Sequence, residues 1–214
     1  ANVDTLYIGT QLTSPKYSHN EARDVLQLPL NKTIITNISA TEHIKGIDTI
    51  LQAVALLKRR GIEVIFAHIG GLRSNTLEQQ QYADLLKQMV VDLDIKDNVV
   101  WLGRRTDVQD ILPMADIYVH PSRSEGLGSV LLEASVAGLS LVGSIVGGIP
   151  EIVQHNVNGL LINADNTEQL ADAIEQVLMT KHTYGEKARE MVYQTFDQTR
   201  QAHKLLNLYN VVTQ

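Results

Sequence analysis

The chain has 214 residues, of which 44% are hydrophobic and 20% charged, and its formal net charge at pH 7 is −6. This composition is typical of a globular core, and the acidic balance with scattered Lys and Arg excludes the basic footprint of a nucleic-acid-binding protein. The absence of cysteine excludes disulfides, thiolate metal sites and thiol catalysis, and it fits a reducing compartment.

Residues 1–20 contain turn formers and no clear helical period, so we expect them to form an interdomain linker segment. The first ten residues have neither the basic start nor the apolar centre of a signal peptide. No apolar run approaches the roughly 18 residues that a membrane-spanning helix needs. We therefore expect a cytoplasmic protein.

Short apolar runs rich in β-branched residues alternate with segments of helical periodicity from residue 32 onward. The predicted strands are residues 32–39, 63–70, 98–103, 116–121 and 139–144, and the predicted helices are residues 47–61, 76–93, 108–115, 129–138 and 167–180. Strands that are apolar along their whole length and alternate with helices predict a parallel sheet covered on both faces. The expected fold class is α/β, with a Rossmann-like doubly wound parallel sheet over residues 21–182.

Ligands of such sheets bind beyond the carboxyl ends of the strands, which directs attention to the loops after Ile38, Leu102 and His120. Residues 183–214 form a different kind of segment, a polar helical stretch with widely spaced apolar positions. We expect these C-terminal helices to pack across a neighbouring surface.

The stretch SRSEGLGSVLLEASVAG, residues 122–138, follows a predicted strand and enters a predicted helix. Free amides of Gly128, Ser129 and Val130 would point into this loop and make an anion site. Gly126 and Gly128 have no side chain to block a phosphate or a sugar that approaches the backbone. The alternative is a simple turn with a serine cap.

Glu133 lies one turn into that helix, and its neighbours are almost all apolar. An ionised carboxylate in such a place is costly unless something hydrogen-bonds to it. The alternative is that Glu133 only complements the positive end of the helix or pairs with a distant arginine. The residues alone support both interpretations equally.

From PSRSEGLGSVLLEASVAG through LVGSIVGGIPEIVQHNVNGLLI, the chain resembles the donor-binding, C-terminal lobe of the retaining GT-B glycosyltransferases, in particular glycosyltransferase family 4. Glu125 and Glu133, with seven residues between them, match the signature pair of that family. The resemblance extends to KGIDTILQAVALLKRRG, to DIKDNVVWLGRRTDVQDILPMADIYVHPS and to VNGLLINADNTEQLADAIEQVL.

The resemblance implies a role for each matching position. Glu133 would bind the ribose hydroxyls of a nucleotide, and Glu125 would bind hydroxyls of the donor sugar. Lys45 would neutralise the diphosphate. Sugar and diphosphate would contact the backbone of Gly126, Leu127, Gly128, Ser129 and Val130, and the base would lie near Gly103, Arg104 and Arg105. For either arginine, a solvated charged loop is the favoured alternative.

One position departs from the family. Its members usually carry an arginine about five residues before the lysine, and this chain has Ala40 there. A second cation at the leaving group contributes a few kcal/mol of stabilisation. Either activity is compromised or another residue, such as His43 or Arg104, supplies the charge.

The implied reaction is transfer of a hexose from a nucleotide diphosphate sugar, UDP-sugar before GDP-sugar, with retention at the anomeric carbon. Such enzymes require no cofactor and no metal, and the seven histidines, at positions 19, 43, 68, 120, 155, 182 and 203, do not cluster at ligand spacings. The resemblance also implies a partner, the N-terminal acceptor-binding lobe, which is missing from this sequence and toward which the C-terminal helices of residues 183–214 would pack back. Peripheral membrane contact through that lobe is left open.

We expect the isolated lobe to bind a nucleotide but to catalyse little or no transfer. Two alternatives remain: a noncatalytic nucleotide-binding or interaction module on the same fold, which Ala40 favours, and a sugar-nucleotide epimerase.

Overall fold

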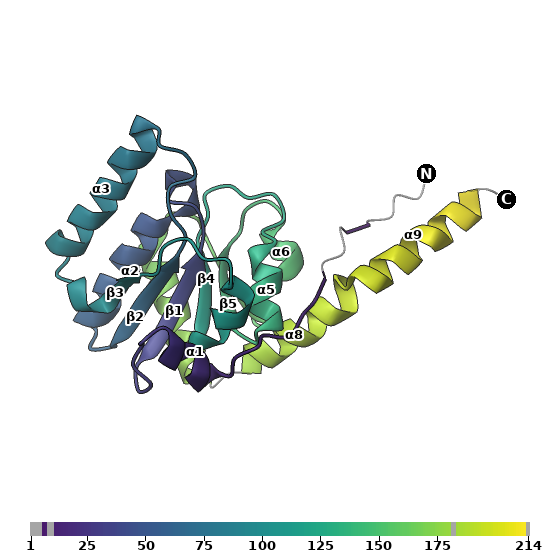
Figure 1. Ribbon diagram of the computed structural model, residues 1–214, viewed down its shortest axis with the longest axis horizontal. Helices are drawn as coiled ribbons and strands as arrows, with labels where there is room; N and C mark the ends of the chain where they lie inside the picture. Colours follow the sequence, from purple (N-terminus) through teal and green to yellow (C-terminus); the bar gives the residue numbers. More distant parts are fainter. Residues whose placement is uncertain (1–5, 8–10, 181–182, 213–214) are drawn as a thin grey trace.

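The computed structural model describes residues 6–7, 11–180 and 183–212 (Figure 1). The strands are β1 (Thr33–Ile38), β2 (Val64–Ile69), β3 (Val99–Trp101), β4 (Ile117–His120), β5 (Ser140–Ser144) and β6 (Gly159–Ile162). The α-helices are α1 (His19–Val25), α2 (Ile47–Arg59), α3 (Leu77–Asp92), α4 (Val108–Ile111), α5 (Val130–Val136), α6 (Ile149–Ile152), α7 (Thr167–Met179), α8 (Thr183–Thr195) and α9 (Gln198–Val212). Three short 3-10 helices are η1 (His43–Lys45), η2 (Lys96–Asn98) and η3 (Leu112–Met114).

The six strands form one parallel sheet in the order β3-β2-β1-β4-β5-β6. Chain order therefore reverses between β1 and β4, where Ile35 pairs with Ile117 and Thr36 with Tyr118. This is the doubly wound, Rossmann-like order, and it opens a crevice beyond the carboxyl ends of β1 and β4. The predicted fold class is confirmed.

Helices cover both faces of the sheet, which is why its strands are rich in buried apolar residues. One face packs on α2, α3 and α7, through buried residues that include Ile50, Leu86 and Ile174. The opposite face packs on α1, η3, α5, α6 and α8, through buried residues that include Leu131 and Val192. The strands thus form the middle of three layers, and the loops at the strand ends remain available for a site.

Helix α1 is an element that the sequence analysis did not predict. Ser18 and Glu21 form a capping box, in which Glu21 accepts hydrogen bonds from the backbone amide of Ser18 at 2.8 Å and from its hydroxyl at 2.7 Å. Inside the helix, the fully buried Arg23 donates to the carboxylate of Asp116 at 2.8 Å. This ion pair ties α1 to the start of β4.

The segment before α1 lies against the domain, because Lys16 donates its backbone amide to Asp110 at 3.0 Å and the ring of Tyr7 contacts that of Phe196 at 4.7 Å. Helix α8 packs on α5 and β5, whereas α9 extends away from the sheet (Figure 1). Of the predicted linker, residues 1–5 and 8–10 lie outside the described residues, as do residues 181–182 at the end of the predicted domain and residues 213–214 of the C-terminal segment. In the described part of the chain, no helix combines the length and the apolar character that crossing a membrane requires.

Candidate functional site

A cavity of about 380 Å³ opens at the carboxyl edge of the sheet, above the point where chain order reverses. Its walls come from the loops after four strands, β1 to β4, so the loop after β2 joins the three that the sequence analysis singled out. The lining residues are Ile38, Ser39, Ala40, Lys45, Ile69, Gly70, Gly71, Arg73, Arg104, Arg105, Val108, His120, Glu125, Gly128, Ser129 and Val130. Size and position both suit a small-molecule site.

A larger cavity, about 640 Å³, lies at the amino edge of the sheet. Its charged side chains already have partners: Asp116 pairs with Arg23 at 2.8 Å, and Arg189 donates to the carbonyl of Val136 at 2.9 Å. Ligands of doubly wound sheets bind at the carboxyl edge. We therefore place the candidate site in the smaller cavity.

Glu125 is held by three groups in the wall of that cavity. Its Oε2 atom accepts from Lys45 Nζ at 2.8 Å and from His120 Nε2 at 2.9 Å, and Ser122 Oγ lies 3.4 Å away. The hydrogen bond from His120, supported by Lys45, outweighs the opposing effect of burial and lowers the pKa of Glu125 to about 2. Glu125 is therefore ionised at neutral pH and acts as a hydrogen-bond acceptor.

The backbone at Glu125 is fixed by the loop after β5. Gly148 donates its amide to the carbonyl of Gly126 at 2.6 Å. Gly147 has a φ of +51°, and a Cβ atom there would overlap the carbonyl oxygen of Glu125. A glycine is required at this position for both reasons.

The segment that carries Lys45 is tied to the same loop through Arg123. The backbone amide of Arg123 donates to the carbonyl of Ile44 at 2.8 Å, and its guanidinium binds both oxygens of Asp48 at 3.0 and 2.7 Å. Such bidentate pairs fix geometry as well as charge. Lys45 and Glu125 are thereby held face to face although 80 positions separate them in the sequence.

Glu133 has the opposite environment. It is half-buried on α5, whose residues Leu131, Leu132, Ala134 and Val136 are buried. Burial raises the pKa of its carboxyl group. Within the described part of the chain, no hydrogen bond or ion pair reaches this carboxylate.

The loop that precedes α5 also contains polar groups without a hydrogen-bond partner among the described residues. Ser129 makes no capping hydrogen bond, so the alternative of a serine-capped turn finds no support. Among the described residues, the amides of Gly128 and Ser129 have no acceptor. Both residues line the cavity.

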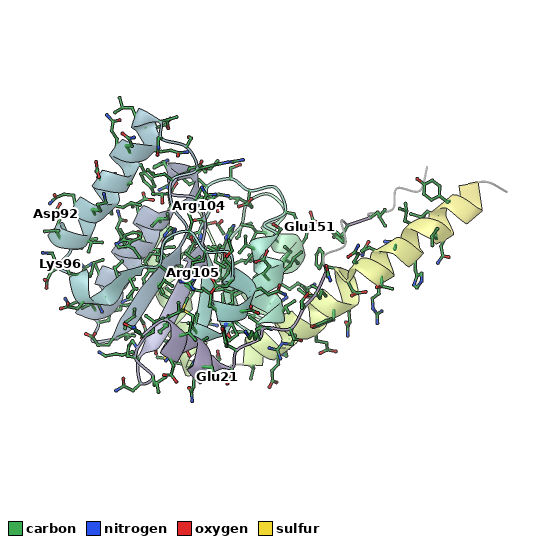
Figure 2. All side chains as sticks on the ribbon, viewed as in Figure 1. Glu21, Asp92, Lys96, Arg104, Arg105 and Glu151 are labelled. Atoms are coloured by element: carbon green, nitrogen blue, oxygen red, sulfur yellow. The ribbon has the colours of Figure 1, made fainter. Side chains whose placement is uncertain are left out.

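Four cationic side chains line the cavity, and two of them are neutralised. Lys45 pairs with Glu125, and Arg105 pairs with Asp107 at 2.6 Å. Arg73 and Arg104 are exposed and make no ion pair with any described residue. Arg104 and Arg105 follow β3 and lie between α3 and α6 in the view of Figure 2. The cavity therefore carries unneutralised positive charge although position 40 is an alanine.

The structure brings seven of the predicted site residues to the cavity: Lys45, Arg104, Arg105, Glu125, Gly128, Ser129 and Val130. The other four, Gly103, Gly126, Leu127 and Glu133, are not among the lining residues, and the roles of all the predicted site residues remain predictions. Sequence reasoning missed His120, Arg73 and Ser39. The only signal for His120 is its position at the end of a strand, five residues before Glu125. No three His, Asp or Glu side chains of the described residues are grouped as metal ligands would be.

Curated relatives of this chain are glycosyltransferases. It is 30% identical over 185 residues to the N-acetyl-alpha-D-glucosaminyl L-malate synthase of Bacillus anthracis, covering 85% of this chain and 45% of that protein. It is 32% identical over 162 residues to a GDP-mannose-dependent alpha-(1-6)-phosphatidylinositol monomannoside mannosyltransferase of Mycobacterium tuberculosis, covering 69% of this chain and 40% of that one. The chain thus spans less than half the length of both relatives.

Solved structures share the fold of this chain, which matches part of one larger protein and nearly all of one isolated C-terminal domain. Anabaena HepE in complex with UDP superposes with a TM-score of 0.86 at 25% identity, covering 96% of this chain and 57% of that chain. The C-terminal domain of LpcC, a glycosyl transferase group 1 protein of Francisella tularensis, superposes with a TM-score of 0.76 at 21% identity and is covered over 99% of its length. The family described as Glycosyl transferases group 1 matches residues 18–197. With that match over most of its length, on a Rossmann-like sheet of the GT-B type, the chain belongs to the group 1 glycosyltransferase family.

Proposed function

We propose that this chain is the donor-binding domain of a retaining glycosyltransferase of hexosyltransferase type, and that it binds a nucleotide diphosphate sugar in the cavity beyond β1 and β4. The observation that carries the proposal is the pairing of charges there. An ionised glutamate is fixed in one wall, and the cations Lys45, Arg73 and Arg104 stand in the others.

This arrangement suits the parts of such a ligand. Free amides at Gly128 and Ser129, with Lys45, offer donors to a diphosphate. Glu125 offers an acceptor to sugar hydroxyls, and because it stays ionised at neutral pH it is not a general acid. The protein would then contribute positioning and charge stabilisation, while the departing phosphate takes the proton of the acceptor.

UDP is the favoured nucleotide, and GDP comes next. HepE has been solved with UDP and with UDP-glucose, which supports UDP, whereas the mycobacterial relative is named as GDP-mannose-dependent. The acceptor would bind to a second lobe, because the relatives are more than twice as long as the matched region.

Calorimetric titration of this chain with UDP, GDP and ADP tests the proposal. Saturable binding of one nucleoside diphosphate, competed by its sugar conjugate, is expected. Lys45→Ala should weaken that binding, whereas Lys58→Ala, which removes a lysine paired with Asp94 outside the cavity, should leave it unchanged. Absence of binding by all three would refute the proposal.

A noncatalytic module is the second candidate, and Ala40 is the observation that favours it, since the usual second cation is missing there. Joining this domain to an acceptor lobe and assaying sugar transfer separates the two functions. A noncatalytic module would bind the nucleotide and transfer nothing.

A further inference from the structure

His120 is a buried histidine at the last position of β4, with only 2% of its surface exposed. Its two ring nitrogens face different partners. Nε2 lies 2.9 Å from Glu125 Oε2 and 3.2 Å from Ser122 Oγ, and Nδ1 lies 3.3 Å from the hydroxyl of Tyr118. The ring therefore connects the core of the sheet to the carboxylate in the cavity wall.

The two oxygens of Glu125 are not equivalent. Oε2 is contacted by Lys45, His120 and Ser122, whereas the single contact on Oε1 from a described residue is the amide of Gly126 at 3.3 Å. A carboxylate oxygen has two lone pairs, so Oε2 is saturated and Oε1 retains accepting capacity. One oxygen anchors the side chain, and the other can receive a ligand.

The neighbours of His120 fix which ring nitrogen faces Glu125. Glu125 is ionised and accepts, so Nε2 of His120 is the nitrogen that donates to Oε2. Tyr118 is fully buried, and burial raises the pKa of its hydroxyl, which therefore keeps its proton; the hydroxyl lies 3.3 Å from Nδ1 and 3.4 Å from the carbonyl oxygen of Ile38, to which it also donates. The two rings are stacked with their centroids 5.9 Å apart, so Tyr118 holds the histidine ring in the orientation that donates to Glu125.

Lys45 cannot replace this anchor once a ligand is bound, because a diphosphate competes with Glu125 for its ammonium group. Lys45 is also the less buried donor, with 22% of its side chain exposed against 2% for His120. His120 is therefore the contact on Oε2 that can persist in the complex.

We propose that His120 is a positioning residue, which pins Oε2 of Glu125 so that Oε1 accepts a hydrogen bond from a hydroxyl group of the donor sugar. This inference rests on the proposed function, and it assigns His120 to recognition of the sugar rather than of the nucleotide.

The first test needs no ligand. Carbon-13 NMR titration of the Glu125 carboxyl group in this chain should give a pKa of about 2. His120→Leu should raise this pKa toward that of a free glutamate, and His120→Gln, which keeps a donor near the Nε2 position, should raise it less. His68→Leu is the matched control, because His68 is equally buried on β2, which β1 separates from β4, and does not contact Glu125. An unchanged Glu125 pKa in folded His120→Leu overturns the anchoring.

The second test compares a nucleoside diphosphate with its sugar conjugate, using UDP with UDP-glucose and GDP with GDP-mannose. We expect His120→Leu to lower affinity for the sugar conjugate about tenfold relative to the diphosphate, the loss of one hydrogen bond to a charged group. Affinity of His120→Leu for the diphosphate alone should stay within about twofold of wild type, because the hydrogen bond that is lost serves the sugar. His120→Gln should restore part of the difference.

The outcomes separate the two claims. Equal losses for diphosphate and sugar conjugate would mean that His120 serves only the fold, and no loss for either would remove its role altogether. If the wild-type chain binds no nucleotide, the proposed function fails and the sugar assignment fails with it. The NMR titration still decides whether His120 anchors Glu125.

Discussion

Glu133→Gln should make this domain more stable at neutral pH. The substitution keeps the shape of the side chain and removes a half-buried charge that no described residue pairs with. Burial raises the pKa of Glu133 above the value of 4.5 that the unfolded chain has. Below pH 4.5 the carboxyl group is protonated in both states and costs nothing. Stability is lost as the pH rises from 4.5 through the folded pKa, because the charged form is the one that burial destabilises.

The expected gain follows from the environment of the side chain. An unsatisfied buried polar group costs about 1–3 kcal/mol, and the half-buried position of Glu133 places it near the lower end, about 1 kcal/mol. For a chain of this length, 1 kcal/mol corresponds to a rise in Tm of about 2–4 °C. The difference from wild type should disappear near pH 4.

Thermal unfolding of wild type and Glu133→Gln at pH 7 and near pH 4 measures this effect. Glu125→Gln is the matched control, and it should lower Tm at pH 7 because it removes a charge that Lys45 and His120 stabilise. Glu133→Gln should also weaken nucleotide binding by about 1.5–3 kcal/mol, the cost of losing hydrogen bonds to a charged group. A lower Tm for Glu133→Gln at pH 7 would show that the carboxylate has a stabilising partner and would refute the reasoning.

The remaining predictions concern the loops around Glu125. Lys45→Ala should lower affinity for a nucleoside diphosphate by about tenfold in calorimetry, since a charged hydrogen bond is lost, and an unchanged affinity would remove Lys45 from the phosphate site. Gly147→Ala should lower the free energy of unfolding by about 1–3 kcal/mol, because the φ of Gly147 is +51° and a Cβ would overlap the Glu125 carbonyl. A free energy of unfolding equal to that of wild type, measured by denaturant unfolding, would contradict this. The folded pKa of Glu125 is about 2, below its unfolded value of 4.5, so its contribution to stability is complete above pH 4.5 and is lost as the pH falls toward 2. Denaturant unfolding at pH 6 and pH 3 should therefore show a smaller acid loss for Glu125→Gln than for wild type, and equal losses would exclude this linkage.

The sheet could be predicted because each buried parallel strand is a short, nearly continuous apolar run in the local sequence. The apolar runs 32–39 and 63–70 became β1 and β2 with little change at their ends. Prediction failed for short helices. The predicted helix 108–115 is a four-residue helix followed by a 3-10 turn, in which Pro113 lacks the amide that a continuing helix needs. Helix α1 was missed although Ser18 and Glu21 carry the capping-box signature.

Part of the site could be predicted because residues 125–133 come from one strand-to-helix unit that resembles a known family. The long-range partner of Glu125 could not be derived from local pattern. Lys45 reaches it from 80 positions away, and only the order of strands in the sheet brings their loops together. Arg73 was missed for the same reason, because nothing in its local sequence says that the loop after β2 reaches the same cavity.

The two glutamates that the sequence presents as a pair differ in what a ligand offers them. Glu125 is already satisfied by Lys45 and His120, so on the proposed function a sugar hydroxyl adds to an existing set of bonds while a diphosphate competes for the lysine. Glu133 has no partner among the described residues, and a ribose diol would supply its first one. A hydrogen bond that relieves an unsatisfied carboxylate contributes more to affinity than one added to a satisfied carboxylate. Nucleotide binding should therefore depend more on Glu133, and discrimination between sugars more on Glu125 and the histidine behind it.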